Sequence, residues 1–341
     1  MEVKLIGVDI AKRVFQLCCV DEFGETLETH RLRRERFLPF FAGLAPTTIA
    51  LEACATAHHW ARELAMLGHE VRLLPPRYVK SYVWRNKTDA ADAAAICAAS
   101  RDPRIHGVPV KSLEQQAMLT LHRIRELLVR QRTMSGNALR AHLAEFGVVA
   151  PQGQAGLSRL RECVRRPEDL GLPALAIPAL EMLATHWSLL NDRIRDLERS
   201  IKQHHKEDET SRRLATIPGI GPITATALSA TLGDARNFKT GRHLAAWLGL
   251  TPREYASGLK RRQGRISRRG DAYLRRLLIL GAQSRIQRHK PDRPGADPWL
   301  SALRERRPTP VAATALANKT ARIVWAVMAQ GESYQPRRVG T

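Results

Sequence analysis

The hydrophobic residues of this chain change their spacing once, between residues 107 and 112, and this change limits the folds that the chain can adopt. Before it, apolar residues alternate with polar ones or gather in short runs, which is the pattern of β-strands. After it, leucine and isoleucine recur on one face through residues 112–146, which is typical of a long amphipathic helix. The sequence therefore predicts an α/β region followed by an all-α region.

The first region predicts a five-stranded mixed sheet. Its predicted strands are three within residues 3–33, one at residues 48–52 and one at residues 70–74. A helix over residues 58–67 separates the last two strands, and an alanine-rich helix that starts near Asp89 runs to about residue 100. Strands that are first antiparallel and then alternate with helices indicate a mixed α/β domain over residues 1–107.

The helical region predicts two further parts and a tail. Residues 108–207 contain two long helices, at residues 112–146 and 179–205, which predict an antiparallel coiled-coil insertion. A role as a spacer or oligomerisation arm is favoured over a direct part in chemistry. Residues 208–330 are rich in glycine, basic and mostly helical, and residues 331–341 form a turn-like tail.

The charge of the chain indicates a polyanionic partner. The sequence holds 55 Lys and Arg against 33 Asp and Glu, a formal net charge of +22 at pH 7. Nucleic acid or an anionic membrane surface would satisfy this charge. No apolar run approaches the roughly 18 residues that a membrane-spanning helix needs. Nucleic acid is therefore favoured, and no membrane partner is expected.

The location of the protein is predicted from its cysteines and its N-terminus. The five cysteines contain no Cys-x-x-Cys pair, so they predict neither a disulfide framework nor a zinc site. The first residues lead into a strand-like segment without a signal-peptide cleavage site. We therefore expect small, buried cysteines in the reducing cytoplasm of a bacterium.

Four acidic residues occupy positions where a charge needs a partner. Asp9 ends the first predicted strand and Glu52 ends the fourth, each after apolar residues. Asp89 and Asp92 are three residues apart and share one face of the alanine-rich helix. Converging carboxylates repel one another unless they share a proton or a cation, and Mg²⁺ prefers oxygen ligands. We predict that these four acids hold one or two Mg²⁺ ions, with a solvated strand end or a helix cap as the alternative for each acid alone.

Three short motifs carry a resemblance to a known family. They are GVDIAK from Gly7, LEAC from Leu51 with HHWAR from His58, and KTDAAD from Lys87. In this order and spacing they resemble the signatures of the insertion-sequence transposases of family one-ten, the DEDD transposases. The resemblance to this family extends over nearly the whole chain. The resemblance implies an RNase H-like domain similar to the Holliday-junction resolvase RuvC. Residues 55–57 depart from the family, many of whose members carry a glycine pair there, and it stays open whether His58 and His59 line the site or pack on a helix face.

A Gly-x-Gly turn lies near the start of the basic part. Gly219 and Gly221 stand between two predicted helices, where backbone N–H groups can approach a phosphate closely. The pattern resembles a helix-hairpin-helix motif, which holds a nucleic-acid backbone without reading its sequence. The alternative is a tight turn between packed helices.

Lysine and arginine far outnumber acids between residues 253 and 293. The basic residues that we expect to contact nucleic acid are Lys260, Arg261, Arg262, Arg265, Arg268 and Arg269. Such a run is either a solvated face or a face that positions phosphates, and the neighbouring glycines favour the second interpretation.

Ser257 belongs to a Ser-Gly pair just before this basic run. A serine in such a pair is most often part of a turn, and its hydroxyl is a weak nucleophile without activation. Arginines and a metal ion would stabilise the charge that develops during attack. The resemblance implies that Ser257 attacks DNA and forms a phosphoserine intermediate, because family members use a serine in this context. Ser267 is its nearest competitor.

The resemblance also implies partners. Family members act as oligomers, with the acidic domain of one protomer facing the serine of another, and a structured bridge RNA pairs with target and donor DNA. We therefore expect a homo-oligomer, a dimer that becomes a tetramer in the synaptic complex. The expected activity is transposition or site-specific DNA recombination, with Mg²⁺-dependent strand cleavage and exchange. The alternatives are a RuvC-like nuclease that activates water and a non-catalytic nucleic-acid-binding protein.

Overall fold

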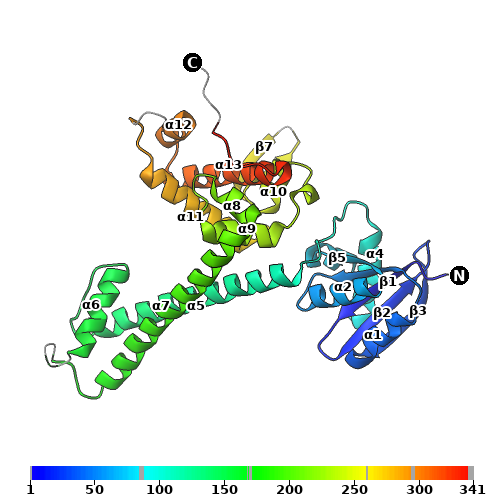
Figure 1. Ribbon diagram of the computed structural model, residues 1–341, viewed down its shortest axis with the longest axis horizontal. Coiled ribbons are helices and arrows are strands. Elements are labelled where there is room, and N and C mark those ends of the chain that lie inside the picture. The colour runs from blue at the N-terminus through cyan, green and yellow to red at the C-terminus, as the bar shows by residue number, and fades with distance from the viewer. Residues whose placement is uncertain are drawn as a thin grey trace. The chain divides into compact units, whose positions relative to one another are not determined.

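The computed structural model describes residues 2–83, 88–166, 168, 171–258, 260–292 and 296–336. The chain divides into two compact units, Met1–Leu113 and Glu114–Thr341 (Figure 1). Lys87, with which the third motif begins, and residues 337–341 of the expected tail lie outside the described residues.

The first unit contains the five-stranded mixed sheet that the sequence predicts. Its strands are β1 (Leu5–Ile10), β2 (Val14–Val20), β3 (Thr26–Arg33), β4 (Thr48–Glu52) and β5 (Glu70–Leu74), in the order β3-β2-β1-β4-β5. β2 is antiparallel to both of its neighbours, β1 and β3, whereas β4 lies parallel to both β1 and β5. This mixed topology is consistent with an RNase H-like domain.

Helices cover both faces of this sheet. The helices of the unit are α1 (Arg34–Ala42), α2 (Ala57–Met66), the short α3 (Pro76–Val79), the 3-10 turn η1 (Lys80–Tyr82) and α4 (Asp89–Arg101). One face packs against α1 and α2, with Phe15, Phe37 and Trp60 at its centre. The other face packs against α4, whose small residues allow the helix to lie close to the strands. Helix α1, which contains Pro39, was not expected from the sequence.

The second unit is mostly helical. Its helices are α5 (Leu113–Ala144), α6 (Gln154–Arg165), α7 (Ile177–Glu207), α8 (Glu209–Ala215), α9 (Pro222–Leu232), the 3-10 turn η3 (Ala235–Asn237), α10 (Gly241–Trp247), α11 (Ala272–Arg288), α12 (Pro298–Arg306) and α13 (Thr309–Gln330). Its main core gathers leucine, isoleucine and alanine side chains from α8 to α13. None of the helices among the described residues is long and apolar enough to cross a membrane.

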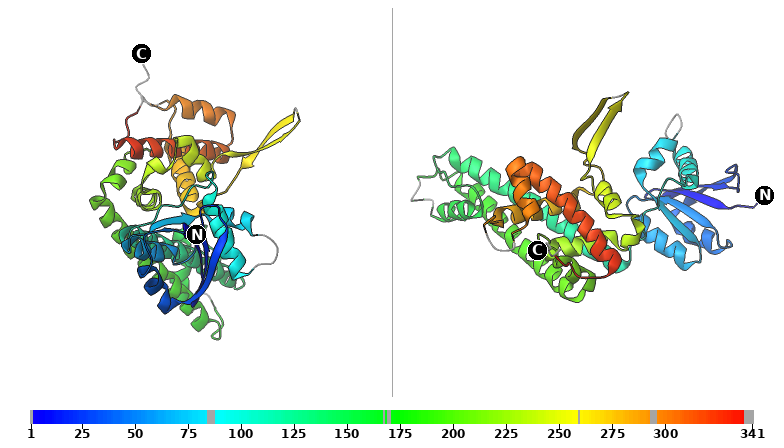
Figure 2. Two further views of the ribbon diagram at one scale, coloured as in Figure 1. Left: turned by 90° about the vertical axis from the view of Figure 1, so that its right-hand side faces the viewer. Right: turned by 90° about the horizontal axis from the view of Figure 1, so that it is seen from above.

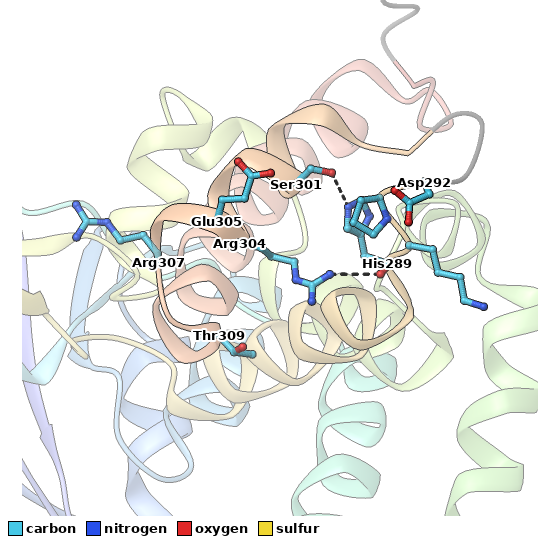
Figure 3. Close-up of a pocket in the computed structure, with 9 residues that line it drawn as sticks. His289, Asp292, Ser301, Arg304, Glu305, Arg307 and Thr309 are labelled. Carbon is cyan, nitrogen blue, oxygen red and sulfur yellow. Dashed lines mark hydrogen bonds between the residues drawn. The ribbon is translucent and has the colours of Figure 1, made fainter.

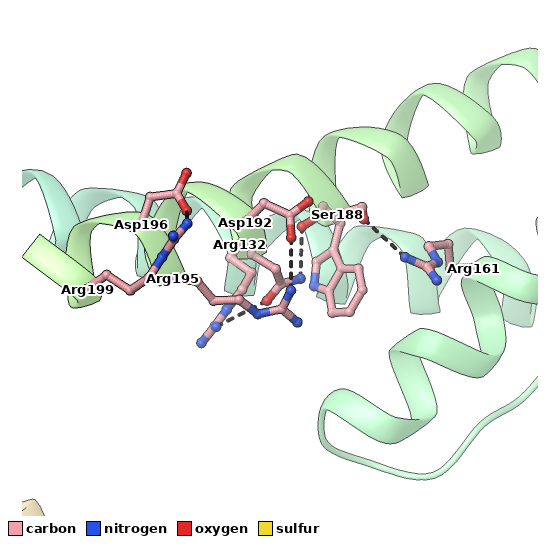
Figure 4. Close-up of polar contacts among 9 residues, drawn as sticks. Arg132, Arg161, Ser188, Asp192, Arg195, Asp196 and Arg199 are labelled. Carbon is pink, nitrogen blue, oxygen red and sulfur yellow. Dashed lines mark hydrogen bonds and ion pairs between the residues drawn. The ribbon is translucent and has the colours of Figure 1, made fainter.

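The two long helices α5 and α7 run antiparallel. Arg125 of α5 donates to Glu198 of α7 at 2.8 Å, and about two turns further along α5 Arg132 donates to Asn191 at 3.3 Å. Past these pairs, Leu139 of α5 shares a buried cluster with residues near the start of α7 and with α6. Ion pairs between neighbouring turns, such as Arg195 with Asp192 at 2.9 Å, follow the exposed side of α7 (Figure 4).

A buried histidine joins α5 to the helical core of its unit. The His122 ring lies 2.9 Å from the hydroxyl of Tyr273 on α11 and 3.0 Å from the hydroxyl of Thr226 on α9. Burial, and then the nearby Arg125 charge, lower the pKa of His122 to about 4. The imidazole is therefore neutral at physiological pH and acts as a structural hydrogen-bonding group.

A two-stranded antiparallel ribbon, which the sequence analysis did not predict, interrupts the helices of this unit. It consists of β6 (Pro252–Ser257) and β7 (Lys260–Ile266), and in Figure 2 it extends, drawn in yellow, away from the helices around it. Every residue of β6 is exposed, and so are most residues of β7. The expectation of an all-α region is wrong at this ribbon, because a ribbon with no buried face carries no alternation of apolar and polar residues. Residues 208–330 are otherwise mostly helical, as expected.

Candidate functional site

The ends of β1 and β4 place two of the predicted acids side by side. The two strands are parallel, and their register ends with Val8 opposite Leu51, so Asp9 and Glu52 are the next residues on neighbouring strands. Side chains alternate between the faces of a sheet. Asp9 therefore projects on the same face as Gly7, and Glu52 on the same face as Ala50, which is the face that α4 covers.

A thiol confirms that both carboxylates lie in one electrostatic environment. Burial raises the pKa of Cys54 most, and the carboxylates of Glu52 and then Asp9 raise it further. The charge of each acid therefore acts on the same sulfur atom. Both acids are half-buried, so their charges are less screened than charges on an open surface.

The helix α4 runs antiparallel to β1, which brings its first turn to the same edge. The Cys97 thiol donates to the carbonyl oxygen of Cys18, the residue opposite Gly7, at 3.3 Å. Near the end of α4, Arg101 donates to the carbonyl oxygen of Glu22, beyond the far end of β2, at 3.0 Å. The start of α4 therefore points toward the ends of β1 and β4.

Close packing at Gly7 fixes this approach. A Cβ atom on Gly7 would lie 2.5 Å from the carbonyl oxygen of Ala93 and 2.6 Å from the sulfur of Cys97. No side chain larger than hydrogen fits between β1 and α4 at this position. Since Gly7 is two residues before Asp9, this close contact of the helix with the sheet lies near the first acid.

The first turn of α4 carries the other two predicted acids. Thr88 is the N-cap, and its side chain accepts a hydrogen bond from the backbone N–H of Ala91 at 3.2 Å. The side chain that accepts the capping hydrogen bond is therefore that of Thr88 and not that of either aspartate. Asp89 is exposed and Asp92 is half-buried. We call the edge formed by Asp9, Glu52, Asp89 and Asp92 the acid edge.

The acid edge supplies only carboxylate oxygens, and these are ligands that suit a hard divalent cation such as Mg²⁺. Within the part of the chain that the structure describes, no three His, Cys, Asp or Glu side chains form a group that could hold a metal ion. The structure thus brings the four acids to one edge without closing them into a single coordination sphere, and their role as ligands stays a prediction.

The segment between Glu52 and α2 contains the departure from the family pattern. Thr56, the N-cap of α2, has a φ of +71°, a conformation that favours glycine over a β-branched residue. The glycine pair that the resemblance leads one to expect in this segment would fit such a backbone. Of the two histidines that follow, His58 accepts a hydrogen bond from the backbone N–H of Lys111 at 3.3 Å, and His59 lies 3.7 Å from Glu63.

Ser257 lies at the outer end of the ribbon. It is the last residue of β6, it is exposed, and it pairs with Lys260 of β7. Gly258 follows with a φ of +56°. The competitor Ser267 lies instead at the base of the ribbon, where its N–H donates to the carbonyl oxygen of Thr251 at 2.8 Å. A polymer such as DNA can therefore reach Ser257 more easily than the half-buried Ser267.

The six basic residues predicted to contact nucleic acid are all exposed. Lys260, Arg261, Arg262 and Arg265 lie on β7, and Arg268 and Arg269 follow it. Arg261 forms an ion pair with Glu254 across the ribbon. At the base, Arg275 of α11 donates to the carbonyl oxygens of Leu248 and Arg269 at 2.9 and 3.1 Å. The ribbon therefore has a fixed base and open strands.

The two glycines of the Gly-x-Gly turn differ in their surroundings. Gly219 has a φ of +93°, and a Cβ atom on it would lie 3.0 Å from the carbonyl oxygen of Gly281 on α11. Gly221 is the N-cap of α9, and no heavy atom beyond the glycine and its chain neighbours lies within 4 Å of the position of its Cβ. Packing between helices accounts for Gly219, whereas Gly221 leaves room for a ligand.

One cleft lies apart from every predicted site residue. It has a volume of about 650 Å³ and is lined by His289, Lys290, Pro291, Asp292, Ser301, Arg304, Glu305, Arg307 and Thr309 (Figure 3). The His289 ring lies 2.9 Å from the hydroxyl of Ser301, and Arg304 donates to the carbonyl oxygen of His289 at 3.4 Å. These hydrogen bonds connect the end of α11 to α12. They account for the positions of the His289 and Arg304 side chains without a ligand.

Two family profiles match the chain. A profile described as "Transposase", of the DEDD type, matches residues 6–147 and so includes all four acids. A profile described as "Transposase IS116/IS110/IS902 family" matches residues 211–295, which include the Gly-x-Gly turn, the ribbon and Ser257.

Individual relatives cover almost the full chain. A "Probable family 20 transposase" of Pseudomonas aeruginosa is 46% identical over 98% of this chain and 100% of its own length. The "Transposase for insertion sequence element IS1328" of Yersinia enterocolitica is 42% identical over 96% of this chain and 98% of its own length. A "Pilin gene-inverting protein" of Moraxella bovis is 26% identical over 81% of both chains.

Proposed function

Because the chain belongs to the IS116/IS110/IS902 family of transposases, and is thus a DNA transposase that acts by phosphoryl transfer, we propose that it cuts and exchanges DNA strands through a covalent bond to Ser257. In this proposal the acid edge holds Mg²⁺, in agreement with the divalent cation that a DEDD transposase domain implies. Family membership confirms the resemblance drawn from the three motifs, and it excludes the alternative of a non-catalytic binding protein.

The observation that carries the proposal is the arrangement of the acid edge. Two half-buried carboxylates lie at the ends of neighbouring parallel strands, Glu52 as the last residue of β4 and Asp9 as the residue before the last of β1, and both act on the Cys54 thiol. An antiparallel helix begins beside them with two more carboxylates. A bound Mg²⁺ would polarise the phosphodiester and stabilise the negative charge of its transition state. The protein contributes the close contact at Gly7, which sets the distance between α4 and the strands.

The bonds made and broken at Ser257 balance without an external energy source. The serine Oγ–H bond breaks as the oxygen attacks phosphorus, and the proton passes to water. The Oγ–P bond forms, one P–O bond to deoxyribose breaks, and the released oxygen takes a proton from water. A free hydroxyl of another strand then attacks the phosphoserine and regenerates Ser257. The exposed guanidinium groups of Arg262 and Arg265 support this role because they can hold the neighbouring phosphates.

A covalent adduct tests this mechanism. The protein is incubated with Mg²⁺, its copurifying RNA and end-labelled DNA that carries the junctions of the insertion sequence, and the mixture is then denatured in detergent. We expect a labelled protein–DNA adduct that disappears in Ser257→Ala and remains in the matched control Ser267→Ala. Cleavage by Ser257→Ala at the wild-type rate would favour the alternative in which the acids activate water.

A mixture of variants tests whether one protomer supplies the acids and another the serine, as in the family. We expect Asp9→Asn and Ser257→Ala each to bind DNA and to be inactive alone. Mixed together, they should regain part of the wild-type strand exchange, because some assemblies then contain one intact acid edge next to one intact serine. Inactivity of the mixture, despite formation of mixed oligomers, would place both groups in the same protomer.

Further parts of the proposal concern partners and modules. We propose that target and donor DNA are paired with a bridge RNA and that the enzyme acts in the cytoplasm of a bacterium. Helices α5 and α7 form a coiled coil that joins protomers into dimers and synaptic tetramers in this proposal. Helices α8 and α9 form a helix-hairpin-helix motif. The net charge of +22 supports a large nucleic-acid surface. The name of the pilin gene-inverting relative supports DNA recombination. Sequencing the RNA that copurifies with the protein tests guidance, since a discrete structured RNA is expected and random fragments would contradict it.

A further inference from the structure

An exposed aromatic ring lies on the ribbon next to the proposed nucleophile. Tyr255 is 57% exposed, although it belongs to a strand, and it is opposite Arg262 in the ladder. Residues two apart on a strand project on the same face. Tyr255 and Ser257 therefore share one face of the ribbon, together with their partners Arg262 and Lys260.

A glycine on the opposite strand makes room for this ring. A Cβ atom on Gly264 would lie 2.9 Å from Cε2 of Tyr255. The ring therefore rests over the backbone of β7 at a position where any side chain would displace it. This contact holds one side of the ring against the ribbon and leaves the other side open to solvent.

We propose that Tyr255 positions the DNA for attack by stacking its open side on a nucleobase within two nucleotides of the phosphate that Ser257 attacks. The inference rests on the proposed role of Ser257. Cα atoms of residues two apart on a strand are separated by about 7 Å. Stacked bases in one strand are separated by about 3.4 Å, so a ring two residues from the nucleophile meets a base one or two steps from the reacting phosphate.

The surroundings of Tyr255 favour a base over a phosphate as its partner. The guanidinium of Arg262 and the ammonium of Lys260, on the same face, are the groups that suit phosphates. An aromatic face offers no hydrogen-bond donor to a phosphate, but it stacks on any nucleobase. Such a contact tolerates different sequences, and it holds the sugar–phosphate next to the base in a fixed place. Tyr255 is thus a positioning residue, and its phenolic oxygen takes no part in the chemistry.

Fluorescence of 2-aminopurine, placed at each of the two positions on either side of the cleaved phosphate, tests the stacking directly. We expect lower fluorescence at one position in complexes of wild-type protein and Tyr255→Phe than in complexes of Tyr255→Leu. Removal of a stacking aromatic weakens binding by about 5- to 150-fold, and we expect a loss in this range for the cleavage efficiency of Tyr255→Leu. Gly264→Ala should give the same loss, because its methyl group displaces the ring while Tyr255 itself is retained.

The outcomes separate this inference from the proposed function. If fluorescence is the same in wild type and Tyr255→Leu while the Ser257 adduct still forms, the stacking inference is wrong and the proposed function stands. If Tyr255 changes the fluorescence but Ser257→Ala still cleaves, the stacking contact is real and the serine mechanism is wrong. Loss of the adduct in Tyr255→Phe would also contradict the inference, because it would assign a function to the phenolic oxygen.

Discussion

The five-stranded sheet and the β6–β7 ribbon are both β-structure, but they present their side chains in opposite ways. The sheet is covered by helices on both faces, and its acids stand at one edge, fixed by the strands and by α4. The ribbon buries neither face, and its reactive serine and basic residues are open to solvent. A covered sheet can hold charged groups in place before any partner binds. The exposed side chains of an open ribbon can contact a polymer directly, and they become fixed only when it binds.

The largest expected difference between the two regions is the effect of removing an aromatic ring. Phe15 of the sheet is fully buried, and its ring lies 4.5 Å from that of Phe37. We expect Phe15→Ala to lower the free energy of unfolding by about 3–5 kcal/mol. Tyr255→Ala in the ribbon should change it by less than about 0.5 kcal/mol. Denaturant unfolding followed by circular dichroism measures both, and similar losses would show that the ribbon is packed in solution.

A smaller effect is expected from acid, and it concerns the buried His122 in the core of the helical unit. His122 has a pKa of about 4 in the folded protein, below the value of about 6.5 of an unfolded histidine. Between these values the unfolded chain binds a proton that the folded protein excludes, so stability is complete above pH 6.5 and falls as the pH drops toward 4. The loss attributable to His122 is about 3 kcal/mol once both values have been passed.

Unfolding measured at a series of pH values checks this expectation. The matched variant His122→Gln keeps a polar side chain near Thr226 and Tyr273 but has no proton to gain. Its stability should therefore fall less steeply between pH 6.5 and 4 than that of the wild type. Equal slopes for the two proteins would mean that other groups cause the acid sensitivity.

The smallest expected effect is a change in the salt dependence of DNA binding. If the ribbon contacts phosphates, Arg262→Gln should lower the slope of log Kd against log salt concentration by about 1. The control is Arg195→Gln on α7, which removes an exposed arginine that is paired with Asp192. Fluorescence anisotropy at several salt concentrations measures both slopes. A change in the control alone would place the DNA surface on the long helices.

Sequence reasoning succeeded where burial dictates the pattern of residues. Residues 48–52 and 70–74 were predicted as strands, and β4 and β5 have the same bounds. The two long helices also lie within a few residues of their expected ends. Each of these elements has a face that must avoid water, and that requirement is visible in the spacing of its apolar residues.

The failures occur where burial gives no signal. The ribbon is polar on both faces, and only its ladder of backbone hydrogen bonds defines it. Likewise, the sequence predicted that the four acids form one metal site, but it could not give the direction in which α4 runs along the sheet. That direction depends on contacts of Cys97 and Arg101 with residues 79 positions earlier in the chain. Gly7, which permits these contacts, carries no side chain that could reveal them.

The contact between Gly219 and Gly281 has a consequence for the evolution of the chain. A Cβ atom at Gly281 would lie 2.1 Å from the carbonyl oxygen of Gly219, and one at Gly219 would lie 3.0 Å from that of Gly281. Any change at either position adds volume, so no substitution at one site can compensate for a substitution at the other. The codons at both positions are therefore restricted to glycine as long as α11 packs against this turn.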